Sequence, residues 1–145
     1  MKAILPILLL ISLTSCIFRR DFKKGTFVYD TNGALPILIP SDYIGDSITT
    51  DSAGNKVRRF KYSNGASFYI ARLVDSATVQ PIDREMNIPK MYPQGVWLYK
   101  GIDTGRLFWR ESQLNHFRFG YRNVPAEWEV KFDSAVNYAS FQKLR

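Results

Sequence analysis

The regular alternation of apolar and polar residues is clearest near the C-terminal end of the chain. Between Phe117 and Arg122, aromatic residues occupy every second position, and arginine or glycine fills the positions between them. A period of two is typical of a strand that buries one face. Two more strands are predicted just before this one, at residues 95–100 and 106–110, with a tight turn between them.

The first half of the chain contains further runs of aromatic and branched residues. They predict strands at residues 26–29, 35–39, 57–62 and 67–73. Prolines flank the second of these, so it is expected at a sheet edge. Asn64-Gly65 separates the last two runs, which predicts a hairpin with a type I′ turn. Residues 41–55 are rich in Asp, Ser, Thr and Gly and predict a loop, and residues 76–93 predict a long connection.

One helix is predicted after this run of strands. Asn123 is expected to cap its N-terminus, with Pro125 in the first turn. Apolar residues then recur with a helical period, at Trp128, Phe132, Ala135, Val136 and Ala139. This stripe is expected to face a core. The elements together predict an α+β fold, an antiparallel sheet of about five or six strands with one C-terminal helix packed on a face.

Composition and charge narrow the class of protein. The chain has 145 residues, of which 46% are apolar and 14% aromatic, enough for one domain with a real core. A single cysteine leaves no partner for an internal disulfide bond. The formal net charge is +7, which in a cytosolic domain would suggest nucleic acid as a partner.

The N-terminal segment changes that interpretation. Lys2 and a nearly unbroken apolar run over residues 3–13 indicate an export signal that is too short to span a membrane. Leu13-Thr14-Ser15-Cys16 then resembles the bacterial lipobox. The resemblance implies that residues 1–15 are cleaved and that Cys16 carries lipid chains in a membrane. The alternative is an ordinary secretory signal with an incidental cysteine.

The expected organisation is a lipidated tether over residues 16–24 and one globular α+β domain over residues 25–145. By resemblance to the sorting pattern of bacterial lipoproteins, Ile17 after the cysteine favours the outer membrane, and the lack of an acidic cluster favours a periplasmic orientation. The last third, with Trp109-Arg110-Glu111, the stretch 119–125 and Phe132-Asp133, is similar to small uncharacterised lipoproteins of the Bacteroidota. That resemblance implies no activity.

The sequence contains few residues that could bind a metal ion or act in nucleophilic catalysis. The chain has one histidine, and its cysteine is expected to be acylated, so neither a metal site nor a cofactor is predicted. A serine hydrolase would need His116 with Ser112 and Glu111, but these lie outside any Gly-x-Ser-x-Gly pattern. His116 is instead expected to end a turn between two strands.

Carboxylate pairs are the remaining catalytic possibility. The pairs Asp83 with Glu85 and Asp103 with Glu111 are formal candidates for a small envelope hydrolase. Most carboxylates in this chain nevertheless lie in turn or helix-start contexts, where solvation or capping explains them. Enzymatic activity is therefore not the favoured hypothesis.

Basic residues form the last candidate site. If the strands share one sheet, its polar face is expected to carry Arg59, Lys61, Arg118 and Arg122. Such a face suits an acidic protein or a lipid phosphate, or it is simply solvated. Export makes nucleic acid an unexpected partner. The favoured hypothesis is a lipid-anchored, non-catalytic binding or structural module, and an alternative is an immunity or inhibitor protein against a toxin or lytic enzyme.

Overall fold

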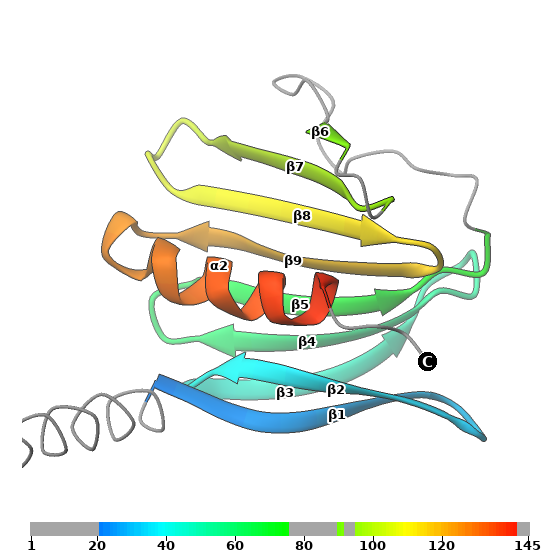
Figure 1. The fold of residues 1–145 in the computed structure, drawn as a ribbon. Coiled ribbons are helices and arrows are strands. Elements are labelled where there is room, and N and C mark those ends of the chain that lie inside the picture. The colour runs from blue at the N-terminus through cyan, green and yellow to red at the C-terminus, as the bar shows by residue number, and fades with distance from the viewer. Residues whose placement is uncertain (1–20, 76–89, 92–94, 142–145) are drawn as a thin grey trace, which may run out of the picture.

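The computed structural model describes residues 21–75, 90–91 and 95–141. In this part of the chain, a seven-stranded antiparallel sheet is covered on one face by a two-stranded hairpin and a helix (Figure 1). The predicted α+β architecture, with the helix packed on one face, is confirmed. The signal peptide, Cys16, Asp83 and Glu85 lie outside the described residues, as does most of the connection at 76–93.

The strands of the large sheet follow an order in which the two halves of the chain meet. Their sequence across the sheet is β3 (Tyr43–Thr50), β4 (Lys56–Tyr62), β5 (Ser67–Arg72), β9 (Phe117–Val124), β8 (Phe108–Leu114), β7 (Trp97–Ile102) and the short β6 (Lys90–Met91). All neighbours pair antiparallel, and β5 pairs with β9 in the middle. Residues far apart in the sequence therefore share one surface.

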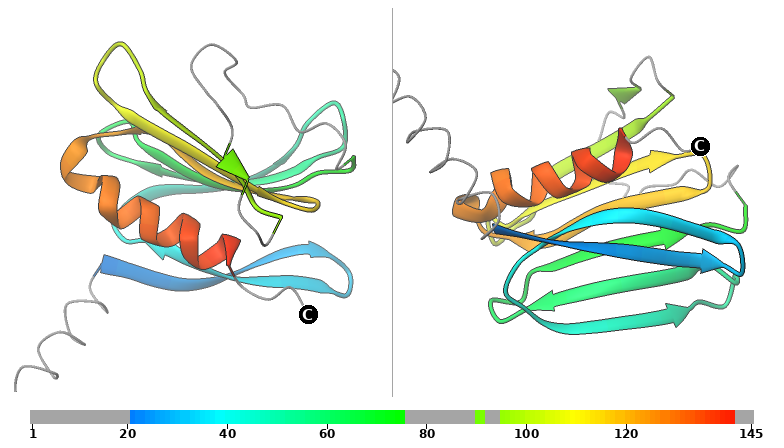
Figure 2. Two further views of the ribbon diagram at one scale, coloured as in Figure 1. Left: turned by 45° about the horizontal axis from the view of Figure 1, so that its top comes forward. Right: turned by 60° about the horizontal axis from the view of Figure 1, so that its bottom comes forward.

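The covering layer consists of β1 (Phe22–Asp30), β2 (Gly33–Pro40) and α2 (Ala126–Ser140). Figure 2 shows the hairpin and the helix side by side on the same side of the sheet. Their apolar residues meet those of β4, β5 and β9 in one core. Phe132 of α2 lies at its centre, with ring centroids 5.0 Å from Tyr62 and 5.7 Å from Tyr121. The predicted apolar stripe of the helix is thus confirmed as core-facing.

A cluster of polar side chains joins the helix to the sheet within this layer. Arg110 is 8% exposed, and its guanidinium lies 2.8 Å from Asp133 of α2, which also accepts a hydrogen bond from the Tyr121 hydroxyl. Asn137 accepts a further hydrogen bond from Arg110. These contacts pair the charge of a buried cation, although its Nε has no hydrogen-bond partner, and they join α2 to β8 and β9. We therefore assign them a structural role.

The prediction of a loop over residues 41–55 was wrong, because Tyr43–Thr50 form strand β3. This strand lies at the edge of the sheet, and most of its side chains are exposed. It therefore lacks the apolar alternation that identifies a half-buried strand. Strand β1 begins at Phe22, so the last three residues of the expected tether are part of it.

The hairpin at Asn64-Gly65 is confirmed, but its predicted type I′ turn was wrong. The Gly65 N–H donates to the Tyr62 carbonyl at 3.1 Å, and the Tyr62 N–H donates to the Ala66 carbonyl at 3.0 Å. Only Gly65 has positive φ, at 84°, whereas a type I′ turn needs positive φ at two central residues. The loop therefore has three residues and ends on a left-handed glycine.

The start of the helix also differs from the prediction. Asn123 has φ of 56° and belongs to β9, so it does not cap α2. The N-cap is Pro125, whose carbonyl accepts a hydrogen bond from the Trp128 N–H at 2.9 Å. Asparagine tolerates the left-handed conformation, which explains its use at the end of this strand instead. Within the described residues, no helix is long and apolar enough to cross a membrane.

Candidate functional site

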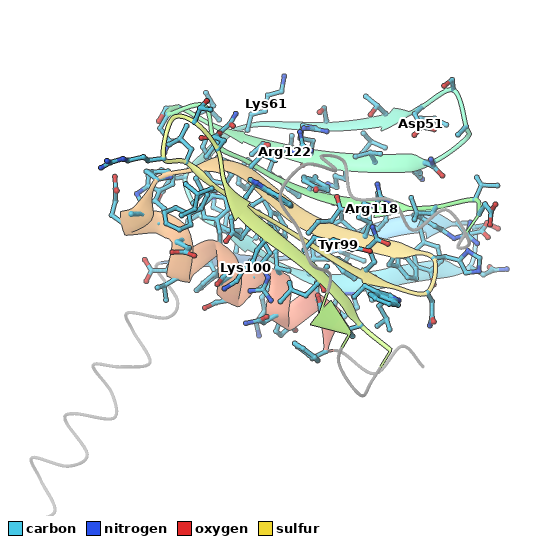
Figure 3. The ribbon with its side chains drawn as sticks, turned by 90° about the horizontal axis from the view of Figure 1, so that it is seen from above. Asp51, Lys61, Tyr99, Lys100, Arg118 and Arg122 are labelled. Atoms are coloured by element: carbon cyan, nitrogen blue, oxygen red, sulfur yellow. The ribbon has the colours of Figure 1, made fainter. Side chains whose placement is uncertain are left out.

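The face of the large sheet opposite β1, β2 and α2 is rich in charged and aromatic residues, and we call it the polar face (Figure 3). Cross-strand pairing arranges it in three rows. The first contains Ser47, Arg59, Tyr69, Gly120, Glu111 and Tyr99; the second contains Thr49, Val57, Ala71, Arg118, Gln113 and Trp97; the third contains Gly45, Lys61, Ser67 and Arg122.

The register places the four predicted basic residues on this one face. Lys61 and Arg122 lie on either side of Ser67 in the third row, while Arg59 pairs with Tyr69 in the first. Arg118 pairs with Ala71 in the second row, which places it diagonally across from Arg59. The expectation that these strands share a sheet is thus confirmed, whereas binding by the face stays a prediction.

Glu111 forms the centre of a buried polar cluster on this face. Its side chain is almost fully buried, at 1% exposure. The Tyr69 hydroxyl donates to Oε2 at 2.7 Å, and the Gln113 amide donates to Oε1 at 2.7 Å. Arg118 Nε lies 2.9 Å from Oε1 in an ion pair whose direction falls short of a hydrogen bond. A buried carboxylate is tolerable here because donors and a cation surround it.

Tyr69 reaches this carboxylate by lying flat across its partner strand. A Cβ atom built on Gly120 would lie only 2.5 Å from the Tyr69 hydroxyl oxygen, so glycine leaves the space that the ring fills. Burial raises the pKa of Tyr69 well above its usual range, and the nearby negative charge of Glu111 raises it further. Tyr69 therefore stays protonated and acts as a hydrogen-bond donor.

Arg59 extends the same cluster toward solvent. Its guanidinium carbon lies 5.5 Å from the centroid of the Tyr69 ring, a cation–π contact that orients the side chain. Among the residues that the structure describes, no carboxylate oxygen lies within 4.0 Å of a side-chain nitrogen of Arg59 or Lys61. Both cations are therefore available to an external anion.

A pocket of about 330 Å³ opens beside Arg59, toward the turn between β3 and β4. Arg59 lines one end of this pocket, and Asn55, four residues before it in the chain, lines the other end together with Asp51. Val57, Ala71 and Arg118 share one cross-strand row between these ends, and Leu73 lies toward Asn55. Sequence patterns alone missed Tyr69, Asp51 and Asn55 as site residues. The single signal that pointed to Asn55 and Asp51 was their place in a polar turn, which is common in proteins of every function.

The structure does not assemble the hydrolase site that was considered from the sequence. His116 is exposed in the turn between β8 and β9, as expected, and its carbonyl accepts a hydrogen bond from the Leu73 N–H at 2.7 Å. Ser112 pairs with Phe119 and belongs to the core side of the sheet, whereas Glu111 is on the polar face. The three side chains therefore do not converge.

The pair of Asp103 and Glu111 is not brought together either. Asp103 is exposed in the turn after β7 and accepts hydrogen bonds from the N–H groups of Gly105 and Leu107, both at 3.0 Å. Glu111 pairs with Tyr99, and Asp103 follows Tyr99 by four residues, so the backbone positions of the two acidic residues are about 13 Å apart along the strand direction. Over the described ranges, no three histidine, cysteine or acidic side chains form a group able to hold a metal ion.

No protein-family model matches this chain, and no curated protein or solved structure matches it. The interpretation of the polar face therefore depends on its own chemistry. That chemistry consists of two available cations, an aromatic support under one of them, and a pocket with polar ends.

Proposed function

We propose that this protein is a non-catalytic binding module of the bacterial cell envelope, anchored through a lipid on Cys16, and that its polar face binds an acidic protein. The observation that carries the proposal is the position of Arg59 and Lys61, two neighbouring cations of one strand face without a carboxylate partner among the described residues. Arginine and lysine in this arrangement suit carboxylates on a partner surface.

The path of the chain favours a protein over a lipid phosphate as the partner. Asp21 is the first residue that the structure describes, and β1 begins at the next residue. The Asp21 carbonyl accepts a hydrogen bond from the Ser41 N–H at 2.9 Å. This entry point belongs to the layer that covers the opposite face of the sheet (Figure 2). The polar face is thus directed away from the layer to which a tether from Cys16 connects.

The chemistry of the buried carboxylate supports a binding role over catalysis. Glu111 is enclosed by Tyr69, Gln113 and Arg118, and its two oxygens already accept two hydrogen bonds and contact a cation. Such a group organises neighbouring side chains and has little access to a substrate proton. We therefore assign Glu111 a role in holding Tyr69 and, through it, Arg59.

Charge reversal on the two layers tests this proposal. Full-length protein carrying Arg59→Glu with Lys61→Glu is compared with protein carrying Lys23→Glu with Lys24→Glu, since Lys23 and Lys24 are exposed cations of β1. Both pairs change the net charge equally. Affinity capture from cell envelopes at low salt should lose the bound acidic protein with the first pair alone, and wild-type capture should weaken as salt is raised.

Equal loss in both double variants would show that overall charge attracts the partner, and unchanged capture would show that the polar face is not used. Binding of the wild type to vesicles with anionic phospholipid, abolished by the Arg59 and Lys61 changes, would point instead to a lipid phosphate. The anchor is tested separately with Cys16→Ser. We expect loss of labelling by a clickable palmitate analogue and release from the membrane fraction, and retention of both would contradict lipidation at Cys16.

A further inference from the structure

The pocket beside Arg59 has three chemically distinct parts, and they specify more than a negative charge. One end carries the Arg59 guanidinium, and the opposite end carries the Asp51 carboxylate. The apolar side chains of Val57 and Ala71 lie between the two, beside Arg118, whose charge is paired with Glu111. A simple anion would use only the first end. The inference that follows rests on the proposed binding role of the polar face, and it names the chemical group that this pocket accepts.

The cationic end is held in place before any ligand arrives. Arg59 stacks on the Tyr69 ring, and the Tyr69 hydroxyl is fixed by its 2.7 Å hydrogen bond to buried Glu111. The long arginine side chain therefore loses less conformational freedom on binding than an isolated surface arginine would. A carboxylate of the ligand receives a pre-oriented pair of N–H donors.

The anionic end is equally rigid. Asp51 Oδ1 accepts hydrogen bonds from the N–H groups of Ala53 and Asn55, at 3.0 and 2.9 Å, and Oδ2 accepts one from the Asn55 amide at 2.9 Å. The side-chain oxygen of Asn55, Oδ1, in turn accepts a hydrogen bond from the Val74 N–H at 2.9 Å. These bonds lower the pKa of Asp51, with the Asn55 side chain as the largest cause, so the carboxylate is ionised at neutral pH.

Asp51 retains capacity for one more donor. A carboxylate has about four lone-pair positions, and the three hydrogen bonds leave roughly one of them for a ligand. Within the described residues, no lysine or arginine nitrogen lies within 4.0 Å of Asp51. An ammonium group would satisfy this carboxylate, with the exposed Thr49 hydroxyl next to it on the pocket wall.

The apolar middle of the pocket fits a short hydrocarbon chain. Val57 and Ala71 are cross-strand partners, and Leu73 continues their surface. The backbone positions of Asn55 and Arg59 are about 13 Å apart, and their side chains take up part of this length, which leaves space for a linker of roughly five or six bonds.

We propose that this pocket binds a zwitterionic ω-amino acid group, in which a carboxylate and a primary ammonium are joined by a short aliphatic chain. The carboxylate lies against Arg59, the chain covers Val57 and Ala71, and the ammonium donates to Asp51. Each end of the ligand meets the opposite charge at a fixed position. Ligands with one charge satisfy one end and leave the other solvated.

Titration with a matched set of small molecules tests this assignment. The probe is 6-aminohexanoate, and the comparison ligands are hexanoate and hexylammonium, each of which lacks one of the two charges. Titrated into the full-length wild-type protein and followed by calorimetry, 6-aminohexanoate should bind about tenfold more tightly than either, since one charge-assisted hydrogen bond contributes roughly that factor. Equal affinity for hexanoate and 6-aminohexanoate would overturn the assignment of Asp51 as the ammonium site.

Two variants and a matched control locate the binding. Arg59→Gln and Asp51→Asn should each weaken 6-aminohexanoate about tenfold, and Asp51→Asn should also remove the preference over hexanoate. Lys56→Gln removes a cation from the same strand but outside the pocket, and it should leave the affinity within a factor of about two. Equal weakening by Lys56→Gln and Arg59→Gln would show a general charge effect. If a pocket variant fails to fold, the ligand series on the wild type decides.

The outcome also separates this inference from the proposed function. Loss of partner capture on charge reversal, without measurable binding of 6-aminohexanoate, overturns the pocket assignment and leaves the acidic-partner proposal standing. Selective binding of 6-aminohexanoate, with partner capture unaffected by charge reversal, would overturn the acidic-partner proposal and support the pocket assignment. It would establish the polar face as a small-molecule site.

Discussion

Substitution of Gly120 by alanine is the sharpest test of how the polar-face cluster is built. A Cβ atom at this position would lie 2.5 Å from the Tyr69 hydroxyl oxygen, 2.6 Å from the adjacent ring carbon and 2.7 Å from the Arg110 carbonyl oxygen. The last contact involves backbone, which moves less readily than a side chain. Tyr69 must therefore leave its position, and its hydrogen bond to Glu111 is lost.

The expected cost combines two contributions. Overpacking in a tight site costs about 1–3 kcal/mol. A hydrogen bond to a charged group contributes about 1.5–3 kcal/mol, and here its loss also leaves a buried carboxylate short of a donor. Alanine recovers about 0.5–1 kcal/mol because glycine loses more backbone entropy on folding. We expect Gly120→Ala to lower the free energy of unfolding by about 2–4 kcal/mol.

Urea unfolding of the full-length protein, followed by tryptophan fluorescence, measures this difference. Gly45→Ala is the matched control, because Gly45 is also a strand residue of the polar face, and a Cβ there would meet only the Lys61 Cβ at an ordinary 3.7 Å. The control should change the free energy of unfolding by no more than about 1 kcal/mol, in the stabilising direction. If Gly120→Ala is as stable as Gly45→Ala, the packing of Tyr69 across Gly120 is refuted, together with its support of Arg59.

Three further predictions concern the turns and the edge of the sheet. Arg106 occupies the left-handed position of the β7–β8 turn, with φ of 57°, and Gly54 and Gly65 occupy the same position in the equivalent turns. Arg106→Gly should therefore raise the free energy of unfolding in urea by about 0.5–1 kcal/mol. A destabilised variant would contradict this. Arg58 donates hydrogen bonds to Asp46 at 2.7 and 3.0 Å and to the Thr26 carbonyl at 2.7 Å, and these contacts join the two layers. Arg58→Met should therefore lower the free energy of unfolding by about 1–3 kcal/mol. An unchanged urea midpoint would show that this junction contributes nothing to stability. The hydrogen bond from Arg58 holds the pKa of Asp46 below its ordinary value of 3.8, so the unfolded chain takes up the proton at a higher pH than the folded protein. The stability that Asp46 contributes is complete above about pH 5 and is lost as the pH falls through the folded pKa. Asp46→Asn should therefore reduce the drop in urea midpoint between pH 6 and pH 3, and a drop equal to that of the wild type would contradict this linkage.

The parts of the fold that were predictable are those in which burial of one face of an element gives its residues a regular period. The alternation at residues 117–122 and the apolar stripe from Trp128 to Ala139 identified β9 and α2, because burial of one face leaves a direct mark on the sequence. Strand β3 shows no apolar alternation in its sequence, since this edge strand buries little surface on either face. The turn at Asn64-Gly65 was recognisable as a turn, but its length depends on hydrogen bonds that composition does not determine.

The candidate site was predictable only in part, for a different reason. That Arg59, Lys61, Arg118 and Arg122 share a face follows from alternation once the strands are paired. The contact between Arg118 and Glu111 depends on the β8–β9 register, which an irregularity between Phe108 and Arg110 shifts. A displacement of one residue would place Glu111 on the other face, so this cluster required the structure.

Photo-crosslinking at matched positions on the two layers tests the central claim, that the polar face binds an acidic protein, most directly. A photoreactive amino acid replaces exposed Ser47, in the same cross-strand row as Arg59, or exposed Thr26 on β1 of the opposite layer, in otherwise native protein in intact cells. We predict an adduct with an acidic protein from position 47 that disappears with Arg59→Glu and Lys61→Glu, and no such adduct from position 26. An adduct from position 26 alone, or one from position 47 that survives both charge reversals, would contradict the account.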